Sequence, residues 1–132
     1  MDLTADQEQF LREHHLAVLA TGRRDGSPQI SSMGYVYDGS HVLMSVTTER
    51  AKWHNVARQP KVAMVVNEGQ RQLVLYGTAE RIAEDPERVT LTRALRSAFG
   101  MEADDDHAAF AAQLDADKRV ILRITPDKVT MN

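Results

Sequence analysis

The sequence predicts a single β-rich domain spanning residues 1–132, with about six strands and three or four helices. Three observations favour this fold class. A chain of 132 residues suits one hydrophobic core. Apolar residues make up 42% and charged residues 27%, as in ordinary globular proteins. The apolar segments are short and are separated by turn signals such as Asp25-Gly26 and Asp38-Gly39, which is typical of antiparallel hairpins.

The strands follow from these short apolar or alternating segments. We expect the first three to form a consecutive antiparallel meander, Gly77 to mark a bulge or a close backbone approach, and Pro126 to interrupt the last strand before Val129. The expected strands are residues 16–21, 29–37, 41–46, 62–66, 72–82 and 119–125.

Helix start and stop signals fill the remaining segments. Thr4 and Gln7 form a capping-box pattern at the N-terminus. A helix is expected over residues 49–58, capped by Thr47-Thr48 and stopped by Gln59-Pro60. Another starts at Asp85-Pro86 and ends at Gly100, and a short one covers about residues 107–114. The apolar face of the third helix is expected to contain Leu91, Leu95, Ala98 and Phe99.

Composition excludes several functional classes. The chain has no cysteine, so disulfides, thiolate catalysis and cysteine-ligated metals are ruled out. A net charge of −3 argues against a general nucleic-acid binder. No apolar run approaches the roughly 20 residues of a membrane-spanning helix, and the N-terminus lacks a basic region followed by an apolar one. We therefore expect a cytoplasmic protein that contacts neither nucleic acid nor membrane.

Metal and hydrolytic sites are also not expected. None of the five histidines has a zinc-binding spacing, and the carboxylates of Asp104, Asp105 and Asp106 are more typical of a solvated connection between helices. Ser31 and Ser32 have no activating base nearby in the sequence. Trp53 is expected to pack its helix onto the sheet.

The segment Thr47-Thr48-Glu49-Arg50-Ala51-Lys52 has the components of an anion site. It combines two hydroxyls, two cations and the amides of a helix N-terminus within six residues. Arg50 and Lys52 can converge on one anion only if the helix begins near them, because positions i and i+2 of a helix do not share a face. A solvated helix start with surface charges is the alternative interpretation.

At this point the sequence resembles a known family, the pyridoxamine 5′-phosphate oxidase-like split barrels, and within it the flavin/deazaflavin oxidoreductases that use coenzyme F420. The resemblance rests on the order and spacing of several segments along most of the chain. These segments are residues 22–37, Arg50-Ala51-Lys52-Trp53-His54-Asn55, Gln59-Pro60-Lys61-Val62-Ala63, Tyr76-Gly77-Thr78-Ala79 and residues 119–126.

The resemblance implies a six-stranded antiparallel split β-barrel that forms a homodimer and binds its cofactor in clefts between the subunits. It also implies which residues bind the cofactor. Thr47, Thr48, Arg50 and Lys52 would hold its phosphate, and Gln29, Ser31 and Ser32 would face its tail or ring. Pyridoxamine oxidation itself is not expected, because the sequence lacks the arginine- and proline-rich C-terminal segment of the true oxidases.

The resemblance implies an F420-dependent oxidoreductase that transfers hydride between reduced deazaflavin and an electron-poor double bond of a small organic substrate. FMN could replace F420, and a non-catalytic cofactor- or ligand-binding dimer would carry the same phosphate site. No catalytic residue is identified; water or a hydroxyl such as that of Tyr35 could supply the proton.

Overall fold

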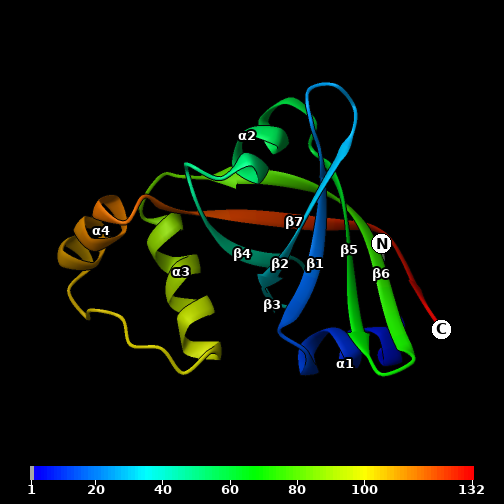
Figure 1. Ribbon diagram of the computed structural model, residues 1–132. Helices are drawn as coiled ribbons and strands as arrows, with labels where there is room; N and C mark the ends of the chain where they lie inside the picture. Colours follow the sequence, from blue (N-terminus) through cyan, green and yellow to red (C-terminus); the bar gives the residue numbers. More distant parts are fainter. Residues whose placement is uncertain (1) are drawn as a thin grey trace.

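The computed structural model describes residues 2–132 and consists of one seven-stranded antiparallel sheet with four helices around it (Figure 1). The strand order across the sheet is β2-β1-β5-β6-β7-β4-β3. The strands are β1 (Leu16–Gly22), β2 (Pro28–Gly34), β3 (Val36–Tyr37), β4 (Val42–Thr47), β5 (Lys61–Glu68), β6 (Arg71–Ile82) and β7 (Arg119–Met131). The helices are α1 (Ala5–Glu13), α2 (Ala51–Arg58), α3 (Glu87–Ala98) and α4 (His107–Ala116).

The sheet is strongly curled, because its two edge strands are neighbours in the chain. β2 and β3 lie at opposite edges of the strand order, yet only Tyr35 separates them in the sequence. The two edges must therefore approach each other, and the result is a curled half-barrel. The predicted fold class, mainly β with flanking helices and an antiparallel sheet, is confirmed in this form.

The strand count differs from the expected six, because the segment 29–37 divides into β2 and β3 at Tyr35. The Tyr35 amide donates a hydrogen bond to the carbonyl oxygen of His15 at 2.9 Å, and its hydroxyl donates to the carbonyl oxygen of Leu11 at 2.8 Å. Tyr35 is fully buried, so these two bonds and its packing hold the chain at the point where it passes between the sheet edges.

The pairings expected of the meander are present, since β1 pairs with β2 and β3 pairs with β4, both antiparallel. The middle strand divides at Tyr35, however, so these two hairpins lie at opposite edges of the sheet, and β4 pairs with β7 on its other side. Val42, Leu43 and Met44 are all buried, so β4 needs cover on both faces and obtains it between the barrel core and α3.

The last strand also differs from expectation, since β7 continues through Pro126 to Met131. Pro126 pairs with Gly77 where the β6–β7 register shifts, so a residue without an amide donor lies at an irregular point of the ladder. The prediction of a bulge or a close backbone approach at Gly77 is confirmed, since the register shifts there and an added β-carbon would lie 2.7 Å from the Thr125 carbonyl oxygen.

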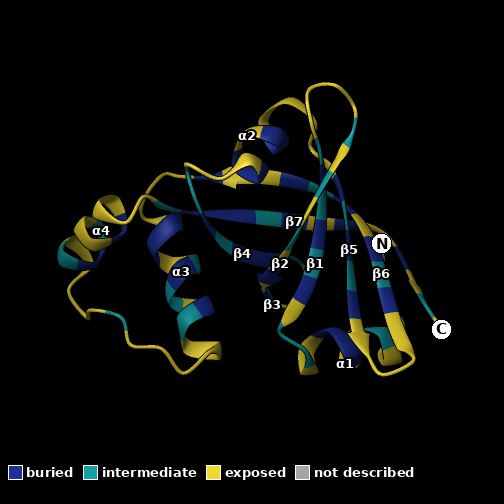
Figure 2. Cartoon of the chain, viewed as in Figure 1, coloured by how far each residue is buried: buried dark blue, intermediate teal, exposed yellow. Residues whose placement is uncertain are grey.

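Two of the three apolar clusters in residues 2–132 pack helices against the sheet, and the third joins α3 and α4; buried residues are dark blue in Figure 2. The larger lies inside the curl and includes Leu19, Met64 and Leu122 from the strands, Leu11 from α1 and, as predicted, Trp53 from α2. The smaller lies between α3 and the outer side of β4 and β7, and consists of Leu43, Ile82, Leu95 and Ile121.

The buried face of α3 is rotated from the predicted one. Leu95 is buried as expected, but Ala98 and Phe99 are exposed, and Val89 and Thr92 occupy the buried side. Buried Arg88 accounts for part of this orientation, because its guanidinium binds both carboxylate oxygens of Asp85, at 2.8 and 3.0 Å, and reaches Asp115 of α4 at 2.9 Å.

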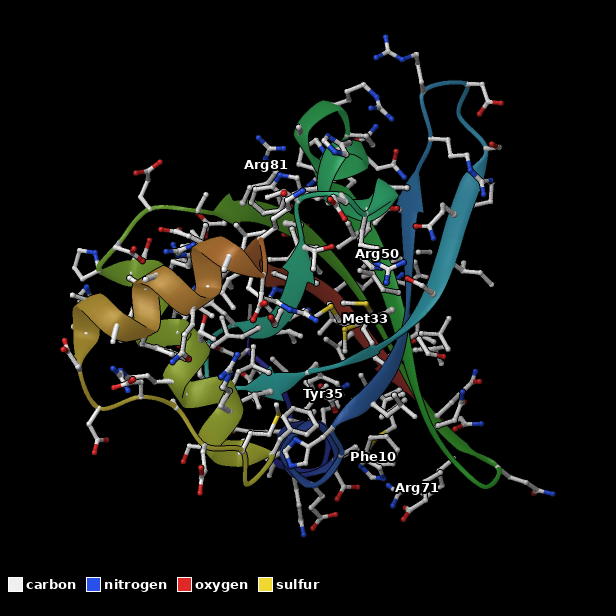
Figure 3. All side chains as sticks on the ribbon, turned by 60° about the vertical axis from the view of Figure 1, so that its left-hand side comes forward. Phe10, Met33, Tyr35, Arg50, Arg71 and Arg81 are labelled. Carbon is white, nitrogen blue, oxygen red and sulfur yellow. The ribbon has the colours of Figure 1, made fainter. Side chains whose placement is uncertain are left out.

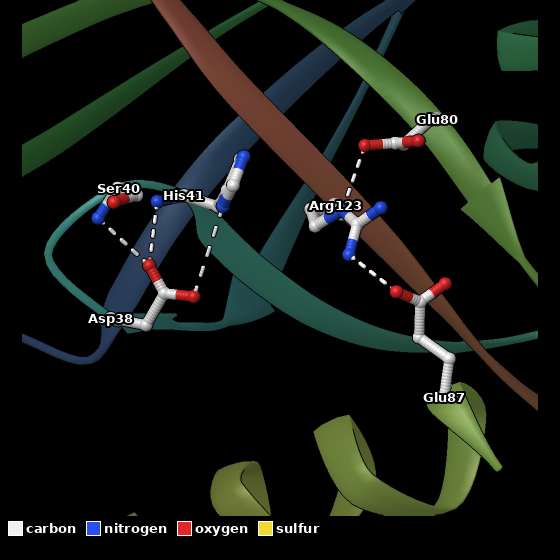
Figure 4. A network of polar contacts seen from close by, with 6 residues as sticks. All are labelled: Asp38, Ser40, His41, Glu80, Glu87 and Arg123. Carbon is white, nitrogen blue, oxygen red and sulfur yellow. Dashed lines mark hydrogen bonds and ion pairs between the residues drawn. The ribbon is translucent and has the colours of Figure 1, made fainter.

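A second arginine fixes α3 to the sheet. Arg123 of β7 donates to Glu80 of β6 at 2.7 Å and to Glu87 in the first turn of α3 at 2.9 Å (Figure 4). Two arginines thus fix the N-terminal end of α3 from different sides. No helix within residues 2–132 is long and apolar enough to cross a membrane.

Candidate functional site

A cavity of about 350 Å³ lies between β2, β4 and the start of α2, and we call it the β2–β4 pocket. It occupies the side of the curled sheet where the edge strand β2 approaches β4. Figure 3 shows Arg50 and Met33 in this region. The lining residues are Ser31, Ser32, Met33, Ser45, Val46, Thr47, Arg50, Lys52 and Arg119.

The end of β4 supplies the polar floor of this pocket. Leu43, Ser45 and Thr47 alternate with the core residues of β4, so they share the face that α3 covers. Leu43 lies under the helix, and the later positions of this face carry hydroxyls. Arg119 of β7 pairs directly with Thr47, which brings its side chain to the same site.

The start of α2 supplies two cations. The helix begins at Ala51, with Arg50 at the N-cap position and no side chain bonded there, so the expected cap by Thr47-Thr48 is wrong. Thr47 instead ends β4, and a turn closed by the bond from the Arg50 amide to the Thr47 carbonyl oxygen at 3.1 Å connects strand and helix. Since the helix starts between Arg50 and Lys52, both side chains can reach the same pocket.

The positive charge of the pocket is not compensated by the protein. Lys52 is only 9% exposed, yet among residues 2–132 its ammonium group has no hydrogen-bond or ion-pair partner, and neither do the guanidinium groups of Arg50 and Arg119. No Asp or Glu lines the cavity. Burial, and then the Arg50 charge, lower the pKa of Lys52. Three cations without a counter-ion around a cavity, one of them buried, indicate a site for an anionic ligand.

The hydroxyl of Ser31 points to the same conclusion. Within the described part of the chain, Ser31 Oγ is the one buried side-chain nitrogen or oxygen without a hydrogen-bond partner. Buried polar atoms are almost always paired, and this one belongs to a residue that lines the cavity. A ligand oxygen in the pocket would supply the missing partner, so the residues fit a phosphate-bearing group.

The structure brings most of the predicted cofactor residues together, but not all. The pocket contains Ser31, Ser32, Thr47, Arg50 and Lys52. Gln29 and Thr48 are not among its lining residues. The Gln29 side chain accepts a hydrogen bond from Thr21 at 3.1 Å, and the Thr48 amide donates to the carbonyl oxygen of Lys118 at 3.0 Å.

Ser31 and Ser32 differ in orientation. Ser31 pairs with buried Leu19 of β1, whereas exposed Ser32 pairs with Val18 on the opposite face. Both residues line the pocket all the same, so β2 borders it with side chains from both of its faces.

Ser45 and Arg119 were missed by the sequence reasoning. A serine in the otherwise apolar run of residues 42–46 was the available signal for Ser45. Arg119 had none, because its place depends on the long-range pairing of β7 with β4. The interpretation of Tyr35 as a proton source is wrong: its buried hydroxyl is bonded to Leu11, and burial raises its pKa far above the usual range.

A larger cavity, of about 540 Å³, adjoins the first, and we call it the α3 pocket. It lies between α3, the end of β2 and the connection from α3 to α4. Ser45 and Arg119 line both cavities. The full lining is Gly34, Ser45, Thr92, Leu95, Arg96, Phe99, Met101, Asp117 and Arg119.

Comparison with known proteins agrees with this architecture. Residues 3–132 match the family model described as pyridoxamine 5′-phosphate oxidase. The F420H(2)-dependent biliverdin reductase of Mycobacterium tuberculosis is 35% identical over 79 residues, a stretch that spans 58% of each chain. A solved structure described as an F420 reductase is 28% identical, with a TM-score of 0.75 and coverage of 97% of this chain and 98% of that one.

A conserved hypothetical protein from Mycobacterium tuberculosis shares the fold, with a TM-score of 0.82 at 23% identity, over 99% of this chain and 84% of that one. Because the family model covers nearly every residue, the chain belongs to the pyridoxamine 5′-phosphate oxidase family.

Proposed function

We propose that this protein is an F420-dependent oxidoreductase that holds the cofactor phosphate in the β2–β4 pocket. The observation that carries the proposal is the buried, uncompensated Lys52 beside Arg50, Arg119 and the unpaired Ser31 hydroxyl. The names of two similar proteins, an F420H(2)-dependent biliverdin reductase and an F420 reductase, support the deazaflavin over other phosphate-bearing cofactors.

Each residue of the pocket then has a role that follows from its chemistry. Lys52 and Arg50 bind the phosphate oxygens, with Arg50 able to donate two parallel hydrogen bonds. Thr47 and Ser31 donate hydroxyl hydrogens to the same group. We extend the assignment to Ser32, Thr48 and Gln29, with Gln29 on the side of β2 that Ser31 occupies, one pleat further from the phosphate.

When bound, the deazaflavin supplies a hydride to an electron-poor double bond of a small organic substrate. The protein's contribution is to fix the cofactor and admit the substrate beside it. The Tyr35 hydroxyl is buried away from the cavities, so water or a hydroxyl that lines them would supply the proton that completes the reduction.

Titration of the purified protein with F420 and with FMN, side by side, tests the cofactor assignment. Tighter binding of F420 is expected. Reduced F420 should then be consumed with unsaturated carbonyl compounds or tetrapyrroles, followed by its absorbance. Binding of FMN alone would favour the flavin alternative, F420 binding without turnover on any acceptor would favour a carrier, and binding of neither would overturn the proposal.

We also propose that two copies pair through the outer face of β2, β1, β5 and β6. The register places Ile30, Ala20, Ala63 and Tyr76 in one row across these four strands. Ile30 is 65% and Tyr76 48% exposed, and the neighbouring row also carries valines. An apolar face of this kind is typical of an interface, and a second copy would cover it symmetrically. β2 borders the pocket as well, so the partner would lie beside the cofactor.

Ile30→Glu combined with Tyr76→Glu should convert a dimer into a monomer, because the paired faces would bury four unpaired carboxylates. Multi-angle light scattering measures the mass directly. Ala112→Glu, on the exposed side of α4, adds a carboxylate away from this face and should leave the dimer intact. A wild-type monomer, with and without cofactor, would contradict the dimer.

A further inference from the structure

We propose that the α3 pocket is the substrate compartment, and that it takes a ring-bearing organic carboxylate. This inference rests on the proposed function, which assigns the neighbouring β2–β4 pocket to the cofactor phosphate. It adds a second site and names the chemical class of its ligand.

The two cavities adjoin each other at two side chains that line both. Ser45 lies on β4 two residues before Thr47, and Arg119 pairs with Thr47 across the ladder, so the pair forms the boundary between the pockets. Each cavity, at about 350 and 540 Å³, falls within the ordinary size range of a small-molecule site. A cofactor anchored in the first can therefore lie against a substrate in the second.

The apolar part of the α3 pocket suits an aromatic or similarly flat body. Leu95 lines it, and Phe99 and Met101 remain 41% and 57% exposed although both are large and apolar. Phe99 has a defined place, because its ring lies 5.5 Å from that of His15 and a β-carbon at Gly34 would come within 3.1 Å of its Cζ. A phenylalanine ring and a thioether both contact aromatic rings favourably.

The charged part of the pocket favours an anion. Arg96 and Arg119 line it against the single carboxylate of exposed Asp117. The Arg96 guanidinium is held by a bond to the Glu102 carbonyl oxygen at 3.3 Å and lies 4.9 Å from the Phe110 ring centre, which leaves other N–H groups for a ligand. Arginine matches the planar geometry of a carboxylate with two parallel bonds. The compartment is also preformed, since Arg88 and Arg123 anchor α3.

Calorimetric titration with 2-naphthoate, with neutral 2-naphthamide as the uncharged comparison, tests the compartment without needing turnover. Naphthoate should bind the wild type, and naphthamide should bind about 10-fold or more weakly because it lacks the charge that Arg96 and Arg119 meet. Arg96→Gln should weaken naphthoate binding by a similar factor, and Phe99→Ala by about 5- to 10-fold. Arg93→Gln, on the same helix but outside the lining, is the matched control and should change little.

Cofactor titration of the same variants separates this inference from the proposed function. F420 affinity should be unchanged in Arg96→Gln and Phe99→Ala, and naphthoate affinity should be unchanged in Lys52→Met. Naphthoate binding that survives both α3-pocket variants, or that Lys52→Met abolishes, would overturn the inference. An equal loss of F420 affinity in Phe99→Ala would also overturn it, because the pocket would then hold the cofactor. Failure of the wild type to bind either cofactor would instead count against the proposed function.

Discussion

Lys52→Met should weaken F420 binding by about 10- to 150-fold. A charge-assisted hydrogen bond contributes about 1.5 to 3 kcal/mol, and Lys52 is only 9% exposed where it lines the pocket. Methionine keeps most of the side-chain volume, so the loss reports the ammonium group and not the packing. Arg50→Ala should have a smaller effect than Lys52→Met, because Arg50 is exposed.

The same substitution should leave thermal stability equal or higher. Burial and the Arg50 charge lower the pKa of Lys52, so the folded chain holds this proton less tightly than the unfolded chain. Protonated Lys52 therefore opposes folding at pH values below both pKa values, and the penalty disappears as the pH rises through the folded and then the unfolded pKa. Methionine removes the penalty at neutral pH. The wild-type protein should also lose F420 affinity as the pH rises and Lys52 loses its proton. Because the pKa of Lys52 is lowered, this loss should begin at a lower pH than it would for an exposed lysine.

Parallel measurements of F420 affinity and thermal midpoint check both expectations. Lys118→Met is the matched control, because it removes one nearby positive charge that is already paired with Glu49 at 2.6 Å. The control should retain wild-type affinity within about twofold, since an exposed pair contributes little. If Lys52→Met and the wild type bound F420 with equal affinity, Lys52 would not bind the phosphate. The phosphate site would then lose its main support.

Gly77→Ala should lower the free energy of unfolding by about 3 kcal/mol, the largest stability effect that we expect from a single added methyl group. A β-carbon at this position would lie 2.7 Å from both Ile124 Cγ2 and the carbonyl oxygen of Thr125. The second atom belongs to the backbone of β7, paired with β6 at the centre of the sheet, so it cannot move without disturbing the ladder. Close approach of two strands, and not an unusual φ, requires glycine here.

Chemical denaturation of the two proteins measures this loss, and the thermal midpoint should fall by roughly 10 °C. Gly22→Ala is the control, because a β-carbon there meets only the Gln59 side chain at 3.5 Å, an ordinary contact, and should change stability by about 0.5 kcal/mol or less. A Gly77→Ala protein as stable as the control would show that β7 relaxes away from β6 at the bulge.

Local chemistry allowed several features to be predicted from the sequence. The Thr4–Gln7 capping box is present in both directions, because its partners are three residues apart and need no distant contact. The role of Gly77 could be predicted for a related reason. A glycine inside a strand usually marks a bulge, a bend or a close approach of another backbone. The cluster at residues 47–52 was visible because its cations and hydroxyls are adjacent in the chain, although the exact helix start was not.

Long-range pairing decided the rest. Tyr35 carries a hydroxyl that could donate a proton. Only the tertiary structure shows that this hydroxyl is bonded to the carbonyl oxygen of Leu11 in α1. The sequence by itself determined a β-rich chain with an anion-binding segment before its second helix. The tertiary structure decided that β4 pairs with β7, which brings Arg119 and Ser45 to that segment and opens the α3 pocket beside it. The physical reason is that β4 pairs where both of its faces become buried. The β7 residues that it pairs with lie about 75 positions away in the chain, so the sequence around β4 does not reveal them.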